Sequence, residues 1–163
     1  MSRGNLVGRE RELAELRQGL QGALAGRGGL YMVAGDPGVG KTALADELGA
    51  EAVEAGALVL WGRAWDGGGA PAYWPWLRIL RRLASERDIT AAAARLGPEA
   101  TARLSRLVPD LGLAPRTGAG AGAGAPEADE PDPAGETDTA RFQLFDAVTS
   151  LLRATAADGP LVI

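Results

Sequence analysis

Leucines recur at helical spacing near the start of the chain and predict an amphipathic helix over residues 9–25. Charged residues fill the other faces of this segment, and its apolar stripe consists of Leu13, Leu16, Leu20 and Leu24. Three glycines within residues 26–29 follow directly and predict the end of the helix. We therefore expect a helix with one face to bury, closed by a flexible turn.

Two short apolar runs bounded by glycines predict strands that are buried on both faces of a parallel sheet. They cover residues 30–34 and 57–61, and a helical pattern over residues 41–54 lies between them. A strand, a helix and a strand over about thirty residues have the length and order of a βαβ unit. The predicted fold class is therefore α/β, with a parallel sheet flanked by helices.

More helical patterns follow a glycine-rich loop over residues 62–72, and they cover residues 74–87, 90–96 and 98–108. Residues 112–137 are different, because a Gly-Ala repeat runs into prolines and acidic residues with few large apolar side chains. Ordering a residue costs about 1 to 2 kcal/mol of backbone entropy, which this composition cannot offset. We interpret this segment as a disordered acidic insertion.

Order is predicted to resume with a helix from Asp138 or Thr139 to Ala156, and residues 161–163 begin a third apolar strand. The chain thus divides into four parts. These parts are an N-terminal helical part (residues 1–29), a core (residues 30–111), the acidic insertion (residues 112–137) and the last helix with its strand (residues 138–163).

Composition narrows the chemistry that this chain can perform. The chain has 163 residues and contains no cysteine and no histidine. The absence of these two residue types excludes disulfides, thiolate or imidazole metal sites and Ser-His-Asp catalysis. A net charge of −4 argues against direct nucleic-acid binding by this segment, because basic side chains dominate contacts with phosphates. No run approaches the roughly 18 apolar residues of a membrane span, so we expect a cytoplasmic protein without a membrane partner.

A phosphate-binding loop joins the first predicted strand to the following helix. The segment fits the pattern G-x-x-x-x-G-K-[ST] at every fixed position. It consists of Gly35, Asp36, Pro37, Gly38, Val39, Gly40, Lys41 and Thr42, and Ala43 follows in the helix. In this P-loop (residues 35–42) the backbone N–H groups and the helix N-terminus attract phosphate oxygens. Lys41 would reach the β and γ phosphates, and the Thr42 hydroxyl would bind Mg²⁺.

Lys41 is the only lysine among seventeen basic residues, which places the single ammonium group where the loop requires it. The alternative is a glycine turn that binds nothing. The strand before the loop, the helix after it and this lysine favour a P-loop NTPase over that alternative. ATP is the favoured nucleotide, and GTP stays open as the other.

Three segments together resemble the N-terminal part of the ATPase domain of large bacterial ATP-dependent regulators. They are the VGRE box (residues 7–10), the P-loop and the aromatic segment over residues 69–76. The resemblance is to signal-transduction (STAND) ATPases related to the AAA+ class, including LuxR-type transcription activators. It implies that the VGRE box lies near the adenine, so Val7, Gly8 and Arg9 are further candidates for base contacts. An ordinary helix start with a solvated Arg-Glu pair is the alternative for this box.

The resemblance also implies an incomplete sheet. In this family a strand like residues 161–163 continues into paired acids, and another strand inserts beside the P-loop strand. The sequence contains neither, so we expect an N-terminal fragment that lacks the Walker B acid and has no catalytic residue of its own. The open sheet edge would favour self-association or contact with other domains of a longer ATPase.

Two other hypotheses stay open at this point. The chain could be a metabolic P-loop enzyme such as a small-molecule kinase, with an acceptor bound near Tyr73 and Trp76, or a remnant that binds no nucleotide. The aromatic cluster is a candidate stacking platform, although packing is the favoured interpretation. Arg78, Arg81 and Arg82 are candidates for a finger that reaches a neighbouring subunit, although a solvated helix face is favoured.

Overall fold

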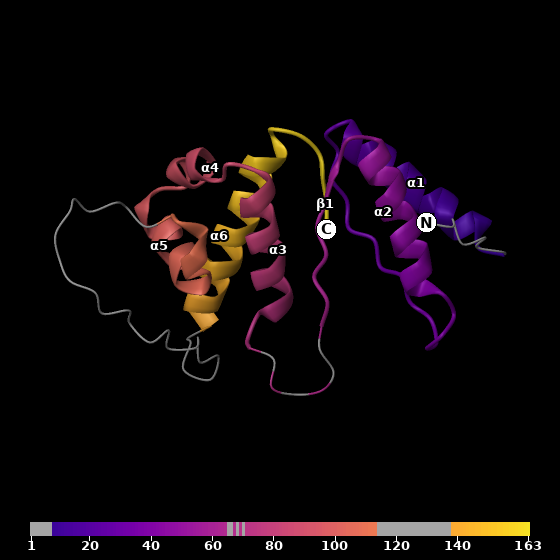
Figure 1. The fold of residues 1–163 in the computed structure, drawn as a ribbon, viewed down its shortest axis with the longest axis horizontal. Coiled ribbons are helices and arrows are strands. Elements are labelled where there is room, and N and C mark those ends of the chain that lie inside the picture. The colour runs from indigo at the N-terminus through magenta and orange to yellow at the C-terminus, as the bar shows by residue number, and fades with distance from the viewer. Residues whose placement is uncertain (1–7, 65–66, 68, 70, 114–137) are drawn as a thin grey trace. The chain divides into compact units, whose positions relative to one another are not determined.

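The computed structural model describes residues 8–64, 67, 69, 71–113 and 138–163 (Figure 1). It divides into two compact units. The first, which we call the P-loop unit, comprises Met1–Val59 and Gly159–Ile163, and the second, the helical unit, comprises Leu60–Asp158. Val7 and most of the predicted acidic insertion, residues 114–137, lie outside the described residues.

The P-loop unit is built on two helices that pack side by side, α1 (Glu10–Leu24) and α2 (Lys41–Glu54) (Figure 1). The predicted leucine stripe of α1 faces α2. The stripe contributes to two apolar clusters. In the first, Leu13 and Leu16 pack with Leu44 and Leu48 of α2. In the second, Leu20 and Leu24 pack with Ala52 of α2 and with Ala57. An ion pair between Arg17 and Glu51 links the two helices at the surface. Apolar burial along one face thus fixes how α1 lies on α2.

Two strands from distant parts of the sequence form a parallel pair. β1 (Leu58–Val59) lies beside β2 (Leu161–Val162), with Leu58 opposite Leu161 and Val59 opposite Val162. The Leu58 amide also donates to the Pro160 carbonyl at 3.0 Å. Parallel pairing requires a long crossover, and here the whole helical unit supplies it. A helix-rich chain with a short parallel sheet agrees with the predicted α/β class.

The predicted strand over residues 30–34 is wrong for this structure. This segment has no regular secondary structure, and Leu30 and Met32 are 90% and 88% exposed. A strand needs a neighbour that takes its N–H and C=O groups, and among the described residues β1 pairs with β2 instead. The apolar pattern therefore identified a segment that could be buried, but no strand among the described residues pairs with it.

The helical unit consists of four α-helices and one 3₁₀-helix among its described residues: α3 (Trp74–Glu86), α4 (Thr90–Arg95), α5 (Pro98–Leu107), η1 (Pro109–Leu111) and α6 (Asp138–Ala156). Every predicted helix is present, with ends that differ by a residue or two. Its largest fully buried side chains are Leu60, Leu80, Leu83, Leu104, Leu151, Val108 and Thr155. Leu113 is buried as well, so packing extends just past the predicted start of the insertion.

Two polar contacts hold the end of α6. Arg87 Nη1 donates to the Thr155 carbonyl at 2.8 Å, and the buried Thr155 hydroxyl donates to the Leu151 carbonyl at 2.8 Å. The last carbonyl groups of a helix lack partners within it, and a cation there also complements the helix dipole. None of the described helices is both long and apolar enough to span a membrane.

Candidate nucleotide-binding site

The P-loop ends at the N-terminus of α2, where its glycines adopt a backbone geometry that other residues avoid. Gly38 has φ +81° and Gly40 has φ +90°, both in the left-handed region. Gly40 is the N-cap of α2, and its carbonyl accepts the first helical hydrogen bond from the Leu44 amide at 3.0 Å. Glycine is required here because the chain must turn sharply to begin the helix.

The start of α2 suits an anion. A helix leaves its first N–H groups without intrahelical partners, and for α2 these belong to the turn that begins with Lys41, Thr42 and Ala43. No acidic residue lies in this first turn, and no side chain caps it. The first turn of α2 therefore contributes no negative charge that would offset the positive end of the helix dipole.

Lys41 folds back over the loop that precedes it. Its Nζ donates to the Gly35 carbonyl at 2.8 Å and to the Asp36 carbonyl at 2.9 Å. These neutral acceptors hold the ammonium group beside the helix N-terminus. Phosphate oxygens would be stronger acceptors for the same group, because they carry negative charge and attract the ammonium group directly.

Thr42 is exposed one residue further along α2. Among the described residues, no group of three or more His, Cys, Asp or Glu side chains could hold a metal ion. Mg²⁺ usually takes only one or two protein ligands and completes its shell with phosphates and water. A single threonine hydroxyl beside a phosphate cradle therefore fits Mg²⁺ bound together with a nucleotide.

The described part of the VGRE box lies against the P-loop. Gly8 donates its amide to Glu10 Oε1 at 3.1 Å. Arg9 donates through Nη1 to Glu12 Oε1 at 2.7 Å and through Nη2 to the Val39 carbonyl at 3.2 Å. The hydrogen bond from Arg9 lowers the pKa of the Glu12 carboxyl below its ordinary value. Sequence patterns did not indicate the contact with Val39, which joins residues thirty positions apart.

A comparison with protein families assigns the chain. The family model for the AAA ATPase domain matches residues 5–163, nearly the whole sequence. The chain belongs to the AAA ATPase domain family. Members of this family generally use ATP and Mg²⁺, so membership indicates nucleotide binding and agrees with the donor groups of the P-loop. Comparisons with curated proteins and with solved structures gave no match.

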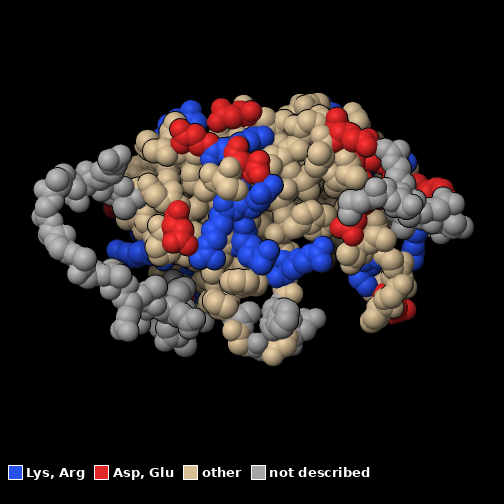
Figure 2. Space-filling view, in the orientation of Figure 1, with Lys and Arg blue, Asp and Glu red and all other residues tan. Residues whose placement is uncertain are grey.

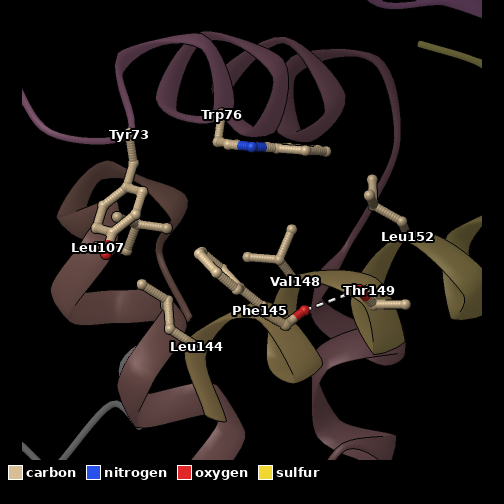
Figure 3. Close-up of a pocket in the computed structure, with 8 residues that line it drawn as sticks. All are labelled: Tyr73, Trp76, Leu107, Leu144, Phe145, Val148, Thr149 and Leu152. Atoms are coloured by element: carbon tan, nitrogen blue, oxygen red, sulfur yellow. Dashed lines mark hydrogen bonds between the residues drawn. The ribbon is translucent and has the colours of Figure 1, made fainter. Parts of the chain in front are cut away.

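The helical unit of this AAA ATPase domain contains a cavity of about 260 Å³ (Figure 3). Side chains from α3, α5 and α6 surround it, and Trp76 faces Phe145 and Val148 across the space (Figure 3). The lining residues are Tyr73, Trp76, Leu107, Leu144, Phe145, Val148, Thr149 and Leu152. The Thr149 hydroxyl donates to the Phe145 carbonyl at 2.8 Å, so it is satisfied within α6.

The aromatic segment takes part mainly in packing. Tyr73 has φ +60°, unusual for a residue other than glycine, and its ring meets Phe145 edge to face with centroids 5.9 Å apart. The Arg78 guanidinium lies 5.7 Å from the Trp74 ring centroid. These contacts favour the packing interpretation, while Trp76 stays 38% exposed beside the cavity.

Basic and acidic side chains both lie on the face of the molecule shown in Figure 2. Two of the three arginines of α3 form ion pairs. Arg81 pairs with Asp110 at 3.4 Å, and Arg82 pairs with Glu86 at 2.6 Å. Exposed pairs of this kind contribute about 0 to 1 kcal/mol. The two ion pairs agree with the solvated helix face that the sequence favoured.

Proposed function

We propose that this AAA ATPase domain binds ATP with Mg²⁺ through residues 35–42 and Ala43, as part of a regulatory ATPase of the signal-transduction type. The carrying observation is the position of Lys41, whose ammonium group lies over the loop at the N-terminus of α2. Left-handed Gly38 and Gly40 support the proposal, because they let the backbone approach a polyphosphate closely.

Each part of the loop has a separate task in this proposal. The N–H groups of the loop and of the first turn of α2 would hold the phosphates, and Lys41 would exchange its two carbonyl acceptors for phosphate oxygens. Thr42 would bind Mg²⁺, which offsets the negative charge of the phosphates. Because α2 begins at Lys41, the same residues would both start the helix and hold the ligand.

The regulatory part of the proposal rests on the contact between Arg9 and Val39. This hydrogen bond joins the start of α1 to the P-loop, so a change in the loop conformation on nucleotide binding would also change the position or stability of α1. A switch needs such a link between its ligand site and an element that can move.

Binding is tested by titrating the purified chain with a fluorescent ATP analogue in the presence of Mg²⁺. Lys41→Ala should weaken binding by about tenfold or more, since it removes charge-assisted hydrogen bonds to phosphate. Arg11→Ala is a control matched in charge, because Arg11 is exposed and pairs with Glu15 on its own helix at 3.3 Å. Equal affinity of the wild type and Lys41→Ala would refute the P-loop as the binding site.

The regulatory role is tested by measuring sedimentation and the amide hydrogen exchange of α1 without nucleotide, with ADP and with ATP. A switch predicts that at least one of these properties depends on the nucleotide. Identical behaviour in all three states would contradict it. Transfer of phosphate from ATP to a small-molecule acceptor would support the kinase hypothesis instead.

A further inference from the structure

Arg9 is held at both ends of its guanidinium group. Nη1 donates to Glu12 on the next turn of α1, and Nη2 donates to the Val39 carbonyl at the P-loop. The guanidinium is a rigid planar fork, so fixing one nitrogen fixes the direction of the others. Glu12 therefore aims the second nitrogen of Arg9 at the loop.

The acceptor is in a part of the loop with little internal restraint. Val39 lies between Gly38 and Gly40, which both adopt left-handed conformations open to few other residues. Glycine rotates more freely than any other residue, so the peptide between Val39 and Gly40 needs an outside contact to hold one orientation. Among the described hydrogen bonds, Arg9 supplies that contact to the Val39 carbonyl.

The orientation of this peptide decides where a phosphate donor points. The described peptide bonds are all trans, so the Val39 C=O and the Gly40 N–H lie in one plane and point in opposite directions. Arg9 binds the carbonyl and thereby turns the N–H to the other side of the loop. The Gly40 N–H belongs to the series of amides that our proposed function assigns to the phosphates.

We infer that Arg9, oriented by Glu12, is a positioning residue that sets the Val39–Gly40 peptide for polyphosphate binding. This inference rests on the proposed nucleotide site and refines it, because it differs from a contact between Arg9 and the adenine. An arginine that acts through the loop serves any ligand with a polyphosphate chain. An arginine that contacts the base serves only ATP.

Calorimetric titration of the full chain with Mg²⁺-ATP and with inorganic Mg²⁺-tripolyphosphate separates these roles. Arg9→Ala should weaken both ligands by the same factor, about fivefold for one exposed hydrogen bond from a charged donor. Arg9→Lys should recover part of the loss for both, since it keeps the charge but lacks the fork. Glu12→Gln should weaken the affinity for both ligands by a smaller factor than Arg9→Ala, and Arg11→Ala should leave both affinities unchanged.

Each other pattern overturns the inference. A loss of affinity confined to ATP would show that Arg9 contacts the base. Unchanged affinity in Arg9→Ala would show that its contact with the loop does not contribute to binding. If the wild type bound neither ligand, the proposed function itself would fail, and this pattern is distinct from the other two. Melting temperatures identify a variant that does not fold, in which case Arg9→Lys and Glu12→Gln carry the test.

Discussion

Gly40 and Gly56 allow stability and nucleotide binding to be separated within one helix. Gly40 precedes α2 with φ +90°, and Gly56 follows it with φ +84°. A Cβ added at either position would have no other atom within 4 Å, apart from its chain neighbours. Replacement by alanine therefore costs backbone strain without a steric clash, and the strain should be the same at both ends.

The expected cost is about 1 to 2 kcal/mol for each variant, the penalty of a left-handed residue with a side chain. For a chain of about 150 to 250 residues, each kcal/mol lowers the melting temperature by about 2 to 4 °C. Binding should respond differently. Gly40→Ala should weaken Mg²⁺-ATP by about tenfold, because relieving the strain turns the Gly40 amide away from the phosphates. Gly56→Ala should leave the affinity unchanged.

Thermal melting followed by circular dichroism gives the stability, and calorimetric titration at a temperature well below both melting points gives the affinity. If Gly40→Ala melts like the wild type, the left-handed geometry is not a constraint at this position. If both variants lose the same affinity, the loss comes from the stability of α2 and not from the orientation of the Gly40 amide.

Three further predictions concern Glu12, Arg87 and Thr42. Because Arg9 depresses the folded-state pKa of Glu12, this carboxylate adds stability above its ordinary pKa and loses it as the pH falls through the lowered value. Melting temperatures between pH 6 and 3 should therefore fall less in Glu12→Gln than in the wild type. Arg87→Ala should lower the free energy of unfolding by about 1 to 2 kcal/mol by removing the bond to the Thr155 carbonyl, whereas exposed Arg153→Ala should have little effect in the same denaturant titration. Thr42→Ala should weaken ATP when Mg²⁺ is present and leave the affinity in EDTA unchanged, and equal losses in both conditions would remove Thr42 from the metal site.

Local patterns determined much of this protein. The helical spacing of apolar residues predicted every described α-helix to within a residue or two, but not the short 3₁₀-helix η1, because an α-helix is held by hydrogen bonds within its own segment. The P-loop pattern likewise predicted a tight glycine turn before a helix that starts at Lys41, and the structure shows Gly40 left-handed at that turn. The nucleotide-binding assignment could therefore be made from spacing alone, and the family match over residues 5–163 agrees with it.

Tertiary structure decided which segments meet. Residues 30–34 and β1 have similar apolar runs, yet only β1 pairs, and its partner β2 lies about a hundred residues further along the chain. The contacts between Arg9 and Val39 and between Tyr73 and Phe145 also join residues that are far apart in the sequence. The periodicity of apolar residues predicts that one face of an element will be buried, but it does not predict which other segment will pack against that face. The sequence therefore determined the helices and the phosphate loop, whereas three-dimensional packing decided the strand pairing and the arginine that holds the loop.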